Sequence, residues 1–75
     1  MAISVLAGDI IVLKNGGVPR RWRIYSVPLP WSADRNYRAF MLGRDEPNRT
    51  FEDGHDELVA LSAEDIAQAQ VELRH

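Results

Sequence analysis

Short apolar runs separated by turn-forming residues dominate the first sixty positions of the chain. Residues 10–13 are all apolar and lie between two glycine-containing turns, as in a short strand that is buried on both faces. We therefore predict a strand over residues 9–14. It should be followed by a type I′ turn at Asn15 and Gly16, because both residue types tolerate a positive φ angle.

The next segment alternates between apolar and basic positions. Arginine and apolar residues alternate over residues 21–24, and this alternation predicts a second strand over residues 20–27. One face of this strand, expected to be buried, carries Trp22 and Ile24. The other face, expected to point to water, carries Arg21, Arg23 and Tyr25.

The remaining strands are shorter or less regular. Two prolines remove ladder donors, so residues 28–35 predict a loop, and this loop carries Trp31. Residues 36–43 predict a third strand, whose register is not assigned because apolar residues fall on both faces. Turn signals on either side predict a short edge strand at residues 50–52 and a last strand at residues 57–61.

The end of the chain has the pattern of a helix over residues 63–73. Ser62 is a preferred N-cap residue, and Asp65, three residues later, can complete a capping box, although less well than Glu would. Ile66 and Leu73 belong to a narrow apolar stripe at three-to-four-residue spacing. The helix is expected to pack on the strands.

Together these elements predict a mainly β protein. A chain of 75 residues buries only about 60% of its unfolded surface and has room for one core. We expect a single domain over residues 1–75, with an SH3-like small antiparallel barrel of four or five strands over about residues 3–61 and a C-terminal α-helix over about residues 63–73. A five-stranded oligonucleotide-binding barrel is less favoured, because that fold usually needs more residues and a helix between strands.

Residues 8–17, Gly-Asp-Ile-Ile-Val-Leu-Lys-Asn-Gly-Gly, have the spacing Gly-Asp-x-apolar-x-apolar-x-x-Gly. This stretch resembles the KOW motif of ribosomal and transcription-factor SH3-like domains. It is more similar to the opening of small bacterial SH3-like proteins that begin Gly-Asp-x-Val-x-Leu-Lys-Ser-Gly-Gly. The resemblance implies that Gly8 and Asp9 turn the chain into the first strand and that Gly16 makes the following turn. Residues 18–21, Val-Pro-Arg-Arg, depart from the KOW pattern, so the resemblance implies a fold and no activity.

Composition and charge narrow the function classes. The chain contains no cysteine, which fits a reducing cytoplasm and leaves no disulfide or thiolate metal site. No stretch approaches the about 20 apolar residues of a membrane span. We therefore expect a cytoplasmic protein without a cofactor. The net charge of −2 hides a segregation, since residues 10–49 hold eight basic and three acidic side chains, whereas residues 50–75 hold one basic and seven acidic ones.

Residues 53–57, Asp-Gly-His-Asp-Glu, are the only cluster with metal-ligand chemistry in the sequence. A metal site needs three or four convergent ligands, and one turn cannot aim them alone. We interpret the cluster as a solvated acidic turn. The chain also lacks a Gly-x-Ser-x-Gly context for a serine nucleophile. We therefore predict no enzyme activity, no catalytic residues and no metal ligands.

Guanidinium groups and aromatic rings gather on the two long predicted strands. The candidate binding residues are Arg21, Arg23, Tyr25, Tyr37 and Arg38, together with Trp31 of the loop. Such a mixture is typical of surfaces that bind RNA or single-stranded nucleic acid. The acidic end of the chain and the negative net charge act against that interpretation. In a competing interpretation, the arginine stems cover the barrel while their heads pair with Glu64, Asp65 or Glu72.

Trp31 lies in the segment Pro-Leu-Pro-Trp and has two interpretations. A tryptophan on a proline-stiffened loop is a suitable anchor for a protein partner. The same ring could instead close one end of the barrel as a lid on the core, which is slightly favoured.

The function we predict is a non-enzymatic interaction module. It would bind a protein partner, or a second copy of itself as a homodimer, through the Arg21, Arg23 and Tyr25 face and the Trp31 loop. Binding of RNA or single-stranded nucleic acid is the alternative, and no membrane partner is expected.

Overall fold

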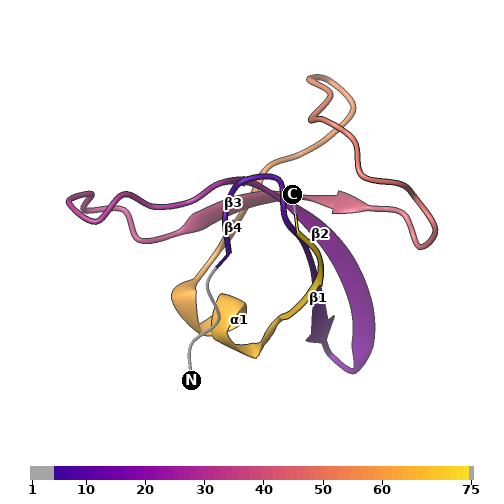
Figure 1. Cartoon of the computed structure of the whole chain (residues 1–75), viewed down its shortest axis with the longest axis horizontal. Coiled ribbons are helices and arrows are strands. Elements are labelled where there is room, and N and C mark those ends of the chain that lie inside the picture. Colours follow the sequence, from indigo (N-terminus) through magenta and orange to yellow (C-terminus); the bar gives the residue numbers. More distant parts are fainter. Residues whose placement is uncertain (1–4, 75) are drawn as a thin grey trace.

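The computed structural model of the chain describes residues 5–74 and has one five-stranded sheet with one short helix (Figure 1). The elements in chain order are β1 (Ile10–Asn15), β2 (Val18–Ser26), β3 (Tyr37–Leu42), β4 (Val59–Leu61), α1 (Ala63–Gln68) and β5 (Gln70–Leu73). The strand order is β4-β3-β2-β1-β5, and all neighbours are antiparallel. The prediction of a mainly β protein is confirmed. No ladder within residues 5–74 joins β4 to β5, so the sheet is open at these two edges.

The β1–β2 hairpin turns on two glycines. Gly16 and Gly17 have φ angles of +67° and +86°, and Asn15 pairs with Val18 across the turn. Two consecutive positive φ angles are typical of a type I′ turn, which glycine adopts without steric cost. The predicted turn is therefore displaced by one residue, because Asn15 continues the ladder and Gly17 takes the second turn position.

Gly8 and Asp9 lead the chain into β1 as the resemblance implied. Gly8 has a φ angle of +97°, and its N–H donates to the carbonyl of Ile24 at 2.8 Å. The buried carboxylate of Asp9 accepts the Leu6 N–H at 3.0 Å. The Asp9 bond closes a tight turn directly before the strand, and the Gly8 bond ties that turn to β2.

Both faces of the sheet are covered, by different means. The face on the concave side, towards α1 (Figure 1), is the helix face, and its buried residues include Ile11, Leu13, Ile24, Ala39 and Ile66. The opposite face is the loop face, where Ile10, Phe40 and Leu42 pack with Phe51 and Leu58. The predicted alternation along β2 is confirmed, since Trp22 packs on the helix face and Arg23 pairs with Phe40 on the loop face. The expectation that the arginine side points to water is wrong, because residues 43–58 fold over it.

The start of the helix is confirmed and its end is corrected. The Ser62 hydroxyl accepts the Asp65 N–H at 3.2 Å, and the Asp65 carboxylate accepts the Ser62 N–H at 3.1 Å, which completes the capping box. The helix stops at Gln68 because Ala69 has extended backbone angles. Residues 70–73, predicted as helix, form β5 and pair with β1. This strand supplies the backbone partners that the second edge of β1 requires.

Two predictions for residues 50–61 are also corrected. Residues 50–52 form no strand, and the last strand before the helix spans only Val59–Leu61 instead of 57–61. Turns occupy the intervening region, where the carbonyl of Glu52 accepts the N–H groups of His55 and Asp56. Among the described residues, no helix has the length and apolarity required to cross a bilayer.

Candidate functional site

Arg21, on the loop face of β2, is held by its own chain. Its guanidinium donates to both carboxylate oxygens of Glu72 at 2.9–3.1 Å and to the carbonyls of Gly43 and Glu46 at 2.9 and 2.6 Å. The side chain is 17% exposed. The pairing of an arginine head with Glu72, one of the interpretations from the sequence, is confirmed for Arg21, although Glu72 lies on β5 and not on a helix.

Arg23 is held in the same way, two residues further along β2. One terminal nitrogen donates to the carbonyl of Arg49 at 2.5 Å, and the guanidinium carbon lies 6.0 Å from the centre of the Phe40 ring. Its Nε is buried without an acceptor within the described residues. This arginine is half-buried and serves as a support for the segment that crosses above it.

Arg49 completes the set and was not singled out from the sequence. It pairs with Glu46 at 2.6 Å and with both oxygens of Asp56 at 2.6 and 2.8 Å, and its guanidinium lies 5.2 Å from the Phe40 ring centre. The Arg49 guanidinium lowers the pKa of Asp56 to about 2, and the two carboxylates raise the pKa of Arg49. We name Arg21, Arg23 and Arg49 the arginine clasp, because they fasten residues 43–58 to the loop face.

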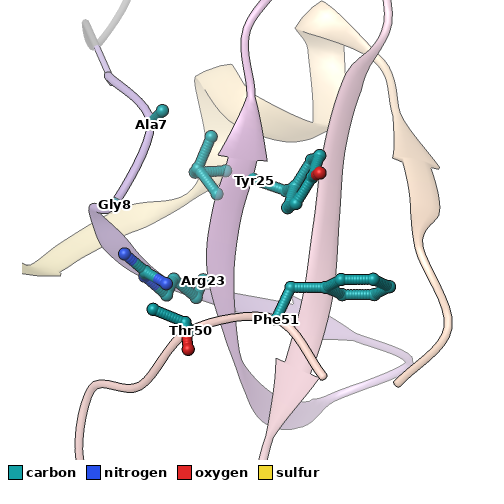
Figure 2. A pocket seen from close by; sticks show the side chains of 7 residues that line it. Ala7, Gly8, Arg23, Tyr25, Thr50 and Phe51 are labelled. Atoms are coloured by element: carbon teal, nitrogen blue, oxygen red, sulfur yellow. The ribbon is translucent and has the colours of Figure 1, made fainter. Parts of the chain in front are cut away.

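Tyr25 borders a shallow hollow of about 420 Å³ between β2, the turn before β1 and residues 50–51. Figure 2 shows the rings of Tyr25 and Phe51 on one side of it, and Ala7, Gly8, Arg23 and Thr50 on the other. The rings of Tyr25 and Phe51 meet edge to face with centroids 5.2 Å apart, a favoured aromatic geometry. Tyr25 remains 49% exposed.

The loop between β2 and β3, residues 27–36, is named the Trp31 loop. Trp31 is 79% exposed and Leu29 is 50% exposed. The interpretation of Trp31 as a lid on the core is therefore wrong, because its ring lies in solvent. In Figure 1 this loop leaves the sheet at the left end of the long axis, whereas residues 43–50 lie at the right end.

Hydrogen bonds within the Trp31 loop give it a defined shape. The Ser32 N–H donates to the carbonyl of Leu29 at 3.0 Å, and the Asp34 N–H donates to the Ser32 hydroxyl at 3.2 Å. The Asp34 carboxylate accepts the Asn36 N–H at 3.0 Å and pairs with Arg38 at 2.7 Å. The bond from Asn36, together with Arg38, holds the pKa of Asp34 below its usual value.

The six predicted binding residues therefore do not form one continuous surface. Arg21, Arg23 and Tyr25 share the loop face of β2, as predicted. Tyr37 packs against the core of the helix face. Arg38 turns to Asp34 at the base of the Trp31 loop, and Trp31 lies beyond the sheet. Of these six, Trp31 is the most exposed.

The acidic turn at residues 53–57 contains one carboxylate, that of Asp56, that is bound to Arg49. Within residues 5–74, no three histidine, aspartate or glutamate side chains converge on one point. Asp56, one of the acidic residues considered there, is bound to Arg49 and also accepts the Glu52 N–H at 2.9 Å. Its carboxylate is therefore part of the cover of the loop face.

Comparison of the chain with models of known protein families, with curated proteins and with solved structures gave no match in any of the three.

Proposed function

We propose that this chain is a non-enzymatic interaction module with an SH3-like barrel fold, and that it binds a protein partner through the Trp31 loop. The observation that carries the proposal is the exposure of Trp31, 79%, on a loop that its own hydrogen bonds keep in one shape.

The barrel interpretation is supported by the order of the strands. An antiparallel sheet in which the first strand lies between the second and the fifth, with a short helix between the fourth and the fifth, is similar to SH3-like barrels. The sheet also curves around α1 (Figure 1).

The energetic argument favours recognition by Trp31. Burying about 200 Å² of tryptophan surface at about 25 cal/mol/Å² gives about 5 kcal/mol before the costs of association. Those costs are lower when the loop is already ordered, and the turn and Asp34 bonds supply that order. Tryptophan is also among the residues most enriched at the energetic centres of protein interfaces.

The arginines weigh against nucleic acid as the main partner. Arg21, Arg23 and Arg38 already donate to carbonyl or carboxylate oxygens of the same chain. These bonds hold the three guanidinium groups against their own chain, so they are less available to phosphates than free surface arginines. We expect no strongly salt-dependent binding of short single-stranded or duplex RNA or DNA in fluorescence anisotropy at low salt, where electrostatic binding is strongest. Binding of any of these probes that weakens steeply as the salt concentration rises would favour the nucleic-acid alternative instead.

The proposal is tested by capture on immobilised wild-type chain and on the Trp31→Ala variant, with extract of the source organism and quantification by mass spectrometry. Leu6→Ala is the matched control, because Leu6 is 64% exposed and lies outside the loop. We expect at least one protein that the wild type and Leu6→Ala retain and Trp31→Ala loses. Identical captured sets on all three chains would contradict the proposal.

Sedimentation of the wild-type chain at tens of micromolar separates a foreign partner from a second copy. A monomer at low and high salt supports a foreign partner. A dimer that Trp31→Ala dissociates would identify the partner as the chain itself.

A further inference from the structure

A groove of about 660 Å³ opens where the β1–β2 hairpin meets the end of β3. Its apolar lining includes Val18 and Pro19 at the start of β2, and Met41 and Leu42 at the end of β3. Val18 is 53% exposed and Met41 is 48% exposed. Exposed apolar side chains that gather in one hollow of this size are typical of binding sites.

Two arginines give the rim of this groove a positive charge. Arg20 and Arg44 line it and are both exposed. Among residues 5–74, neither of them pairs with a carboxylate, and the Arg20 guanidinium contacts only the Met41 sulfur, at 3.7 Å. A third lining arginine, Arg21, is already paired with Glu72. No acidic residue lines the groove, so the charge of Arg20 and Arg44 is available to a ligand.

We propose that this groove binds a segment of a partner protein in which a large apolar side chain stands next to aspartate or glutamate. The apolar side chain would lie in the hollow against Val18, Met41 and Leu42. The neighbouring carboxylates would accept hydrogen bonds from Arg20 and Arg44, for which the guanidinium fork is well suited. Charge complementarity of this kind also speeds the encounter of the two molecules.

The chemistry of the lining favours an acidic protein segment over nucleic acid. Bases are bound by stacking on aromatic rings, and no aromatic residue lines this groove. The net charge of the chain is −2, which gives no overall attraction for a polyanion. None of the residues that line the groove belongs to the Trp31 loop, and that loop leaves the sheet on the side away from the end of β3 (Figure 1), so the groove is a second site.

The experiment uses the full chain as bait for a library of random short displayed peptides. Enriched peptides are then synthesised with a fluorophore, and their affinities are measured by anisotropy. We expect enriched sequences that place Asp or Glu beside Leu, Phe, Met or Trp. The Arg20→Gln/Arg44→Gln variant is expected to weaken their binding about tenfold, equivalent to about 1.4 kcal/mol.

Two further variants separate groove binding from effects of net charge and folding. The Ala63→Glu/Ala67→Glu variant lowers the net charge by the same amount, but on the exposed side of α1. It should change the affinity by no more than about twofold, because a distant surface charge contributes little to binding. Met41→Asp places a negative charge, the same sign as that of the acidic peptide, in the hollow and should abolish peptide binding. Circular dichroism and unfolding midpoints confirm that each variant is folded.

Several outcomes would overturn the proposal. One is the enrichment of sequences without acidic residues, and another is the recovery of no enriched peptide. A third is that Arg20→Gln/Arg44→Gln and Ala63→Glu/Ala67→Glu weaken peptide binding equally. A fourth is that only Trp31→Ala loses peptide binding. A wild-type dimer that Met41→Asp dissociates would also overturn it, because the groove would then be covered by a second copy.

Discussion

Two segments of the chain leave the sheet without joining it, and they behave in opposite ways. The Trp31 loop is shaped by bonds among its own residues and points its tryptophan into solvent. Residues 43–58 fold back over the loop face and bury Phe40 under Phe51. Both segments contain proline and an aromatic residue, so composition does not separate them. The two segments differ in whether side chains of the sheet donate hydrogen bonds to the backbone carbonyls of the segment.

For residues 43–58, those donors are arginines. Arg21 and Arg23 reach from β2 to the carbonyls of Gly43, Glu46 and Arg49, and Arg49 binds Asp56 from within the segment. These bonds supply donors to the carbonyl groups of Gly43, Glu46 and Arg49 and tie this stretch of backbone to β2. The cover thus gives Arg21, Arg23 and Arg49 structural roles and leaves Trp31 exposed.

The largest effect is expected where the cover meets the sheet. Phe40 is completely buried and touches both Phe51 and Arg49. We expect Phe40→Ala to lower the free energy of unfolding by about 3–5 kcal/mol, measured by chemical denaturation. A loss below about 1 kcal/mol would show that residues 43–58 do not form a packed cover.

Phe51→Ala should cost less, because Phe51 is only partly buried. Its ring contacts Tyr25 and Phe40 with centroids 5.2 and 5.8 Å apart. We expect a loss of about 2 kcal/mol in the free energy of unfolding, and faster amide hydrogen exchange across residues 43–58. Exchange that stays unchanged in this segment would contradict its dependence on the aromatic contact.

Asp56→Asn tests the arginine clasp through pH. The pKa of Asp56 is lowered from 3.8 to about 2, chiefly by its hydrogen bonds with Arg49. The charged carboxylate therefore stabilises the folded chain fully above about pH 4, and this stabilisation is lost as the pH falls towards 2. We expect Asp56→Asn to be less stable than the wild type at neutral pH and the gap to close below pH 4. A gap that is independent of pH would show that the Asp56 charge does not act in the clasp.

The smallest effect on stability is expected in the Trp31 loop. With 79% of Trp31 exposed, Trp31→Ala should change the free energy of unfolding by no more than about 0.5 kcal/mol. Denaturation of this variant beside Phe51→Ala makes the comparison of the two segments quantitative. A loss as large as that of Phe51→Ala would place Trp31 in the core.

The sequence predicted correctly those features of the fold that depend on residues adjacent in the chain. The apolar run at residues 10–13, the alternation of Trp22 and Ile24 with the arginines, and the capping box at Ser62 each rest on a few adjacent residues. The register of the strands and the segments that cover the two faces of the sheet depend on residues that are distant in sequence. Val71 pairs with Ile11, and Arg21 with Glu72, 51 positions away. Residues 70–73 therefore match a helical spacing locally, yet form a strand because β1 needs a partner.

The candidate site was predictable in part for the same reason. The sequence places Arg21, Arg23 and Tyr25 on one face, and the structure agrees. It does not indicate that residues 43–58 cover that face, because Arg49 and Asp56 acquire their roles only when the segment folds over Phe40. The exposure of Trp31 likewise differs from the slightly favoured interpretation as a lid, since a proline-rich loop can fold over a barrel end or away from it.

The most direct test of this account is the solvent accessibility of Trp31 in a Trp22→Phe variant, where Trp31 is the only tryptophan. Fluorescence quenching by iodide reports this accessibility. We predict emission close to that of free tryptophan in water, with quenching that approaches that of the free amino acid. Blue-shifted emission that iodide does not quench would show that Trp31 is buried and would contradict the separation between a covering segment and an exposed Trp31 loop.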